Sequence, residues 1–436
     1  MYIVLIMFLI VLLFFCYALF KGEILYPPFI VVLMFTFCTV VGLSRYFDWK
    51  ISDFSGYSTF LILLGLVSFI FAGYVAYVTA PKAIKLKSEP IVRGRIEIPI
   101  IVLWIVIFLS ILNNVMFYSF LNSIARSVGL SGASLSEIIN RYYNLKAYNS
   151  GMFVISGFMN ILNIITNTFA ILCLFVLIHN FCFRDLKKRD FLLAVIVVLD
   201  VVYSLLNSNR SDLLVMLAES VYLIYFFWNM RMGWSKSINF KIVSLGIRLL
   251  AVFIVLFLVL AVLLGRKGSI SEMNIIDYIT IYISSAIRNF DLFVESFTGT
   301  NAIFGKETFF PLNRLLYNFF GIGEYYSMAL SFNSIDGMNI GNIYTAFRRY
   351  YSDFGILGIV ILPGFLGWFF SSMYNRVKAA AKKGQISYQM ILFSYLATAL
   401  FYMPIEDRFF IYDLALSRIA QYILLYILFR YIVYKK

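Results

Sequence analysis

The sequence predicts an all-α polytopic membrane protein with about eleven transmembrane helices and one large loop outside the membrane. Three observations carry this prediction. Of the 436 residues, 62% are hydrophobic and only 13% are charged, and the mean hydropathy of +0.88 lies far above that of a soluble domain. Apolar stretches of about 20 residues, the length that a helix needs to cross a hydrocarbon core, recur along the chain. The longest interval between them is 265–353.

Each apolar stretch is expected to be helical, because a bilayer offers no water to satisfy unpaired backbone groups. The predicted spans are 2–20, 24–43, 57–79, 98–121, 152–178, 191–206, 211–230, 246–264, 354–374, 386–402 and 414–432. The first lacks a basic leader and a small-residue cleavage motif, so we expect it to remain as a span rather than act as a signal peptide. No linker composition and no repeat divides the chain. This predicts one membrane domain over 1–436, with 265–353 as a large extracytoplasmic loop within it.

Basic residues in the short connections predict the orientation, because Lys and Arg are enriched in cytoplasmic loops. When the predicted spans are counted, five basic clusters fall on one side: Lys82, Lys85, Lys87, Arg93 and Arg95; Arg184, Lys187, Lys188 and Arg189; Arg231, Lys236 and Lys241; Arg376, Lys378, Lys382 and Lys383; Lys435 and Lys436. The N-terminus and the long loop are therefore expected outside, and the C-terminus in the cytoplasm. The net charge of +14 is interpreted as this topology signal rather than as a surface for nucleic acid.

The long loop is expected to be ordered, because two of its segments have helical periodicity. In the first, apolar residues recur at Ile276, Ile279, Ile283, Ile287, Phe290, Val294 and Phe297, while Asp277, Ser284, Arg288, Asp291 and Glu295 occupy the other face. Leu312, Leu315, Leu316 and Phe319 repeat the pattern in a shorter segment. Either amphipathic helix fits two roles, a lid packed on the bundle or a substrate-binding helix at the outer interface.

Residue types and motifs that the sequence lacks limit the reactions that it can catalyse. The one histidine, His179, falls at the cytoplasmic end of the fifth span, which excludes HExxH metalloproteases and an outer-face mechanism with a histidine base. The four cysteines, at 16, 38, 173 and 182, lack C-x-x-C spacing, so no disulfide framework or metal cluster is predicted. Walker A, GxGxxG and outer DxD motifs are absent. The sequence therefore favours a reaction without nucleotide, metal or other cofactor.

Arginine-bearing segments mark the predicted outer face. They are the Asn207–Asp212 turn with Arg210, the Tyr344–Gly355 segment with Arg348 and Arg349, the Pro404–Phe409 connection with Arg408, and the long loop with Arg288 and Arg314. Arginine stays cationic at any relevant pH and binds a diphosphate through two parallel N–H bonds. The alternatives are snorkelling to the interface and a surface ion pair. Flanking Asn, Ser, Tyr and Asp residues favour a polar pocket around Arg210 and the Arg348–Arg349 pair.

The chain resembles a family, the O-antigen and capsule repeat-unit polymerases of the Wzy type. The resemblance rests on the number of spans, the late external loop, the Asn-Arg-Ser-Asp turn at 209–212, and Asn342-Ile343-Tyr344-Thr345 followed by Tyr351-Ser352-Asp353-Phe354-Gly355-Ile356-Leu357-Gly358. It implies a polytopic glycosyltransferase, with a fold of the glycosyltransferase-C kind, in the bacterial cytoplasmic membrane. Such an enzyme moves a glycan from polyprenyl diphosphate to the non-reducing end of another lipid-linked repeat unit. A flippase and a chain-length regulator are the implied protein partners.

The residues suit that reaction. Cleavage of the bond between an anomeric carbon and a diphosphate develops negative charge on the leaving group, which fixed cations stabilise, and Arg210, Arg348, Arg349 and Arg408 are the candidates. A carboxylate near the acceptor hydroxyl can act as base, and the candidates are Asp353, Glu406, Asp407 and Asp336. Asp353 also fits the N-cap of the ninth span. Tyr344 and Tyr351 fit sugar stacking, although tyrosines also form the aromatic belt of membrane proteins.

Two other functions fit parts of the sequence. A lipid-linked oligosaccharide flippase or another secondary transporter uses charged residues within its spans, and Asp200 and Glu219 are acidic candidates there. That function leaves the long loop unexplained. Lipid A core O-antigen ligases share the architecture of the polymerases, but they commonly carry a histidine in the external loop, and 265–353 contains none.

Overall fold

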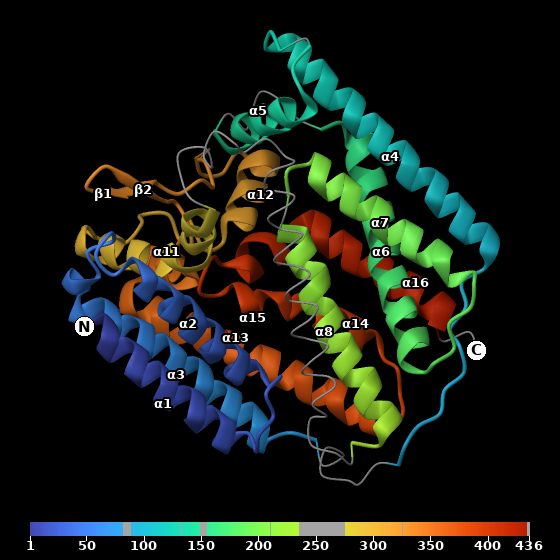
Figure 1. The fold of residues 1–436 in the computed structure, drawn as a ribbon, viewed down its shortest axis with the longest axis horizontal. Coiled ribbons are helices and arrows are strands. Elements are labelled where there is room, and N and C mark those ends of the chain that lie inside the picture. The colour runs from blue at the N-terminus through green and yellow to red at the C-terminus, as the bar shows by residue number, and fades with distance from the viewer. Residues whose placement is uncertain are drawn as a thin grey trace. The chain divides into compact units, whose positions relative to one another are not determined.

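The computed structural model describes residues 1–81, 89–130, 132–148, 155–209, 211–234, 275–324 and 326–433. The described chain is mostly helical (Figure 1). It forms two compact units. Unit 1 contains Met1–Pro81, Met273–Arg376 and Leu396–Ala415, and unit 2 contains Lys82–Glu272, Val377–Tyr395 and Leu416–Lys436. Neither unit is a continuous stretch of chain. This is why no linker composition marks a boundary between them.

Unit 1 begins with three apolar helices, α1 (Tyr2–Leu19), α2 (Pro27–Gly42) and α3 (Gly56–Val78). Pro27 at the first helical position favours the start of α2, because its fixed φ suits a helix and its missing N–H would have no partner there. Ser55 caps α3 by accepting the N–H of Ser58. Two short 3₁₀ turns, η1 (Leu43–Arg45) and η2 (Ile51–Asp53), connect α2 to α3.

The described part of the long loop forms α11 (Ile275–Glu295), α12 (Phe310–Phe320) and an antiparallel hairpin of β1 (Asn333–Ile335) and β2 (Met338–Gly341). Both helices form where the periodicity predicts them. Gly321, at φ 65°, ends α12 in the left-handed conformation that glycine tolerates. Asp336 and Gly337 connect the strands with positive φ at both positions, as a tight two-residue hairpin turn requires.

Helix α13 (Ala346–Lys382) is the longest described element, and its share of unit 1 ends at Arg376. Gly355, with φ 60° and ψ −144°, interrupts its helical backbone. Beyond that break, Gly367 lies so close to α3 that a Cβ there would stand 2.2 Å from the carbonyl oxygen of Phe69. Such glycines permit close approach between helices. The short helix α15 (Thr398–Tyr402) and the π-helical turn η4 (Phe409–Asp413) complete unit 1.

Unit 2 contains α4 (Ile100–Ser127), α5 (Leu135–Tyr148), α6 (Gly157–Cys182), α7 (Asp190–Leu206), α8 (Ser211–Met232), α14 (Tyr388–Leu396) and α16 (Leu416–Val433). Phe117, Tyr142 and Tyr203 pack together in a buried cluster that joins α4, α5 and α7. The hydrophobic periodicity of the sequence predicts no helix in the region of α5. A capping box marks the start of this helix: the N–H of Ser134 donates to Glu137 and the N–H of Glu137 donates to Ser134.

Eight of the described helices are long and apolar enough to cross a membrane: α1, α2, α3, α4, α6, α8, α13 and α16. The protein is therefore a mostly helical, membrane-embedded protein. The predicted span 191–206 forms α7, which has 17 residues, and the predicted span 386–402 is divided between α14 and α15. The predicted span 246–264 lies outside the described residues.

The expectation of two unlike faces on α11 needs a correction. Its apolar residues Ile287 and Phe290 are buried, but so are Arg288 and Asp291 of the face that sequence marks as polar. The N–H of Ser55 donates to Asp291 and the Nε of Arg288 donates to the carbonyl of Trp49. The polar residues in the middle of α11 thus pack on the segment between α2 and α3, whereas Glu295 at its end is exposed.

Candidate functional site

The candidate site is built on the first nine residues of α13, which precede the break at Gly355. Four of the sequence-predicted residues, Arg348, Arg349, Tyr351 and Asp353, lie on this short segment. The N–H of Ala346 donates to the carbonyl of Met403 at 2.9 Å, which ties the start of α13 to the chain that follows α15. The connection after α15 carries three more predicted residues, Glu406, Asp407 and Arg408. Positions about sixty residues apart in sequence therefore meet in unit 1.

Asp353 organises the segment before α12. Its carboxylate accepts the backbone N–H groups of Glu307 at 3.0 Å and Thr308 at 2.7 Å, and the side-chain amide of Asn301 at 2.8 Å. The side chain is thus committed to groups of the long loop rather than to the backbone N–H groups of its own helix. Because it accepts hydrogen bonds from these three donors, the carboxylate holds the long loop against the start of α13.

Arg348 is buried and has protein partners on several sides. Its guanidinium forms an ion pair with Glu307 and lies 4.4 Å from the ring centroid of Phe293 and 5.0 Å from that of Tyr344. Two cation–π contacts and one carboxylate stabilise the positive charge, while its Nε has no hydrogen-bond partner among the described residues. Tyr344 is in turn held by hydrogen bonds of its hydroxyl to Ser331, and burial raises the pKa of Tyr344. These contacts give Arg348 a structural environment.

Arg349 is only half-buried, and its environment differs from that of Arg348. Its guanidinium donates to two main-chain carbonyl oxygens, of Glu307 at 3.4 Å and of Met328 at 3.3 Å. In the described part of the chain no carboxylate forms an ion pair with it. It nevertheless acts electrostatically on Asp353, Glu406 and Asp407. A cation that carries only two long, neutral hydrogen bonds retains donors for an anionic ligand.

The Pro404–Phe409 connection contributes carboxyl groups on which this cation acts electrostatically. Asp407 is buried, and one of its oxygens accepts the N–H of Phe410 at 3.1 Å while the other has no hydrogen-bond partner among the described residues. Burial raises the pKa of Asp407 to about 7, against the opposing effects of the Phe410 N–H and of Arg349. Burial also raises the pKa of the half-buried Glu406, and Arg408 and Arg349 oppose this shift. A carboxyl group that titrates near neutrality suits proton transfer.

Arg408 and Tyr350 lie beside Asp407. The guanidinium of Arg408 is buried and stands 5.2 Å from the ring centroid of Tyr402 and 5.6 Å from that of Tyr412. Tyr350 is fully buried on α13. Tyr350, Asp407 and Arg408 line one small cavity in unit 1. Cation, carboxyl and phenol groups thus face a common space.

Three of the other sequence-predicted residues lie apart from this cluster. Arg288 forms a buried ion pair with Asp291, Arg314 is half-buried on α12, and Asp336 pairs with Lys50 at the exposed hairpin turn. Tyr351 donates or accepts a hydrogen bond with Tyr57 and packs on Phe297. Arg210 lies outside the described residues.

Two residues of the site were not predicted from the sequence. Glu307 pairs with Arg348 and also accepts a hydrogen bond from Ser352 at 3.1 Å, and Asn301 binds both Ser352 and Asp353. They belong to an irregular stretch of the loop, where no periodicity assigns a direction to a side chain. The Gly299–Gly305 interval, bounded by turn-forming residues, is the only local signal.

Comparison with protein-family models, curated proteins and solved structures finds no match to this chain.

Proposed function

We propose that the protein is a glycosyltransferase that polymerises lipid-linked oligosaccharide repeat units. In this proposal the glycan is transferred from a polyprenyl diphosphate to the non-reducing end of another lipid-linked unit, at the outer face of a bacterial cytoplasmic membrane. The N-terminus and the 265–353 loop are outside and the C-terminus is cytoplasmic. The lipid bilayer and the lipid-linked oligosaccharide are the partners, with a flippase and a chain-length regulator acting before and alongside. Nucleic acid and cofactors have no part in it.

The observation that carries the proposal is the environment of Arg349. It is a half-buried guanidinium with two carbonyl contacts and no ion-pair partner among the described residues. It also acts electrostatically on Asp407, whose pKa is raised to about 7. A diphosphate leaving group gains negative charge as the glycosidic bond breaks, and a fixed cation aimed at it lowers the barrier. Arg349 supplies that cation, and Asp407 accepts the proton of the acceptor hydroxyl.

Arg348 and Asp353 support these groups without touching the substrate. The Arg348–Glu307 pair and the Asp353 hydrogen bonds hold the stretch 301–308 against the first turns of α13. The carbonyl of Glu307 is also one of the two groups that position Arg349. The long loop then completes a binding site whose cation and base come from two separate connections of the chain. Arg210 and Arg408 remain further candidates for the diphosphate.

The direct test is an extension assay with the purified full chain in lipid nanodiscs. A defined lipid-diphosphate oligosaccharide should be converted to longer lipid-linked products without nucleotide and with chelator present. Products of two, three and more repeat units are expected. A preparation that stays folded and leaves the substrate unextended contradicts the proposal, and transfer to lipid A core alone indicates a ligase.

A gene deletion separates the polymerase from the flippase alternative. Loss of a polymerase leaves single repeat units on the outer leaflet, where they can still be capped or ligated. Loss of a flippase leaves them facing the cytoplasm. Accessibility of the repeat unit to an external glycosidase in intact cells distinguishes the two, and protected units contradict the polymerase proposal.

A further inference from the structure

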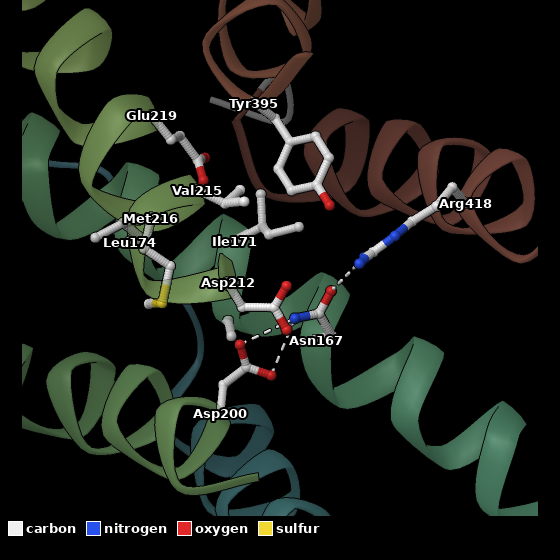
Figure 2. A pocket seen from close by; sticks show the side chains of 11 residues that line it. Asn167, Ile171, Leu174, Asp200, Asp212, Val215, Met216, Glu219, Tyr395 and Arg418 are labelled. Carbon is white, nitrogen blue, oxygen red and sulfur yellow. Dashed lines mark hydrogen bonds between the residues drawn. The ribbon is translucent and has the colours of Figure 1, made fainter. Parts of the chain in front are cut away.

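Unit 2 contains a cluster of ionisable side chains within its apolar helices. Figure 2 shows the cavity around which they gather, with Asn167 from α6, Asp200 from α7, Asp212 and Glu219 from α8, Tyr395 from α14 and Arg418 from α16. Ile171, Leu174, Val215 and Met216 supply the apolar part of its wall. The cavity has a volume of about 20 Å³, which is room for about one water molecule.

Two of the three carboxyl groups are satisfied by neutral donors. Asn167 donates to both oxygens of Asp200, at 3.0 and 2.9 Å, and Asp212 accepts from Ser204 at 3.0 Å and Asn209 at 2.8 Å. Arg418 donates to Asn167 at 3.2 Å, so this amide connects the guanidinium to the Asp200 carboxylate (Figure 2). Asp200, Asn167 and Arg418 thus form one continuous polar chain.

Glu219 differs from both aspartates. It is fully buried, and within the described ranges neither carboxyl oxygen has a hydrogen-bond partner. Figure 2 shows its carboxyl group directed from α8 toward the cavity. An ionised carboxylate without partners in an apolar interior is so unfavourable that the group must be neutralised. Asp200 adds a second negative charge nearby, which makes neutralisation more necessary.

We propose that Glu219 is a proton-binding site within the membrane-embedded helices of unit 2, with Asp200 and Arg418 as its charged neighbours. A hydronium ion delivers the proton, an O–H bond forms on the Glu219 carboxylate, and a water molecule is released into the cavity or to the solvent. The size of the cavity favours a proton over a larger cation, because room for about one water molecule is too little for a hydrated ion. The site does not depend on the polymerase function proposed for unit 1.

The charged and titratable groups that face Glu219 fix what its protonation does. Asp200 on α7 and Asp212 on α8 disfavour a third negative charge, while Arg418 on α16 favours it, and Tyr395 on α14 adds a hydroxyl. Loss of the proton therefore changes the electrostatic interaction between α8 and the helices on both sides. Uptake and release of one proton would be coupled to the packing of these helices.

The test is infrared difference spectroscopy of the full chain in nanodiscs during a pH titration. The wild type should show the carbonyl band of a protonated buried carboxyl group, shifted in D2O and lost as the pH is raised. The measurement is made in an Asp200→Asn/Asp407→Asn background, because these two buried carboxyl groups would give bands of the same kind. In this background Glu219→Gln, which is isosteric and mimics the protonated group, should lose the band while eluting as the parent protein does. The exposed Glu89 of the same unit gives the matched control, and Glu89→Gln should retain the band. Asp200→Asn should also retain it.

Three results would overturn the proposal. One is a wild type without any such pH-dependent band, and the second is a band that survives Glu219→Gln in the Asp200→Asn/Asp407→Asn background. The third is loss of the band at constant pH when sodium replaces choline, which would assign the site to a metal cation. Because none of these measurements uses an oligosaccharide, their failure is distinct from failure of the extension assay.

Discussion

Arg348 and Arg349 are consecutive residues whose guanidinium groups lie in different environments. Arg348 is buried against Glu307, Phe293 and Tyr344, whereas Arg349 is half-buried and donates only to main-chain carbonyls. Helical geometry explains the division, because consecutive side chains point about 100° apart around a helix axis. The pair that sequence treats as one cationic feature is therefore one structural residue and one candidate ligand-binding residue.

Arg348→Ala should destabilise the protein. Removal of the cation leaves the Glu307 carboxylate without its partner and is expected to cost about 3 kcal/mol. The effect is measured by thermal unfolding in detergent, which is monitored as the loss of monodisperse protein. Arg376→Ala is the control, since Arg376 is an exposed residue of the same helix. The double variant Arg348→Met/Glu307→Gln should recover much of the lost stability, and unchanged unfolding of Arg348→Ala would contradict the structural role.

Arg349→Ala should leave folding intact and abolish polymer formation. The lost charge acts on the barrier of the transfer rather than on helix packing. Arg349→Lys should restore little activity, because an ammonium group lacks the planar fork that binds two phosphate oxygens. Polymer length in a deletion strain and protein abundance in its membranes are the two measurements. Normal-length polymer with Arg349→Ala would make this side chain an interfacial anchor.

The choice of control for that experiment depends on the structure. Arg45 has no polar motif around it in the sequence, which suggests that it tolerates alanine. The structure pairs it with Asp48 at 2.9 Å and with Asp277. Arg376 is therefore the better matched control, and its alanine variant should make polymer of normal length.

Activity should rise with pH through about 7 if Asp407 is the base. Its carboxyl group has a raised pKa of about 7, so the ionised, proton-accepting form dominates only above that value. The initial rate of extension from pH 5.5 to 8.5 measures this dependence. Asp407→Asn should lose the activity, whereas Glu406→Gln should retain a pH-dependent rate. A rate that is flat across this range in the wild type would exclude Asp407 as the base.

The raised pKa of Asp407 makes stability fall with rising pH, whereas it makes activity rise. The pKa of an unfolded aspartate is about 3.9, so the folded protein keeps the Asp407 proton to higher pH than the unfolded chain does. Stability from this group is therefore greatest at low pH, decreases as the pH rises from about 4 to about 7, and changes no further above 7. In Asp407→Asn this part of the pH dependence should disappear from the thermal unfolding curves.

Asp336→Asn should have little effect on either stability or polymer formation. Its carboxylate pairs with Lys50 at 2.7 Å, but both side chains are largely exposed, and exposed ion pairs contribute less than about 1 kcal/mol. Polymer analysis and thermal unfolding of this variant check both statements. Complete loss of polymer with normal unfolding would restore Asp336 as a candidate base.

The sequence predicts features that depend on neighbouring residues, but it does not predict contacts between segments that are far apart in the chain. Eight helices long and apolar enough to cross a membrane could be predicted, because hydropathy and length depend on local composition alone. The helical periods of α11 and α12 were local too. The partners of their polar faces were not: whether Arg288 meets a diphosphate or Asp291 and the Trp49 carbonyl depends on packing with a segment more than two hundred residues earlier.

The candidate site shows the same limit. Sequence placed Arg349, Asp353 and Asp407 among the candidates from residue type and predicted side of the membrane. It could not distinguish their roles, because the carboxylate of Asp353 is occupied by donors of the loop, while one oxygen of Asp407 has no partner among the described residues. Glu307 has no periodic signal, since it is an isolated glutamate in an irregular loop next to the Gly299–Gly305 turn region.

Gly355→Ala should weaken the site through the backbone alone. At φ 60° and ψ −144° the residue adopts a conformation that is essentially restricted to glycine. The nearest atom to an added Cβ is Cγ2 of Thr300 at 3.8 Å, so the substitution meets no steric clash, and the expected loss of about 1–3 kcal/mol is backbone strain. Because Arg349 and Asp353 precede this break, the strain should also lower the rate of extension.

Gly94→Ala is the control, since a Cβ at Gly94 meets nothing within 4 Å and its backbone is not left-handed. Thermal unfolding and extension measured on both variants test the argument, and a Gly355→Ala protein that matches wild type in both would show that α13 can pass the site as a continuous helix.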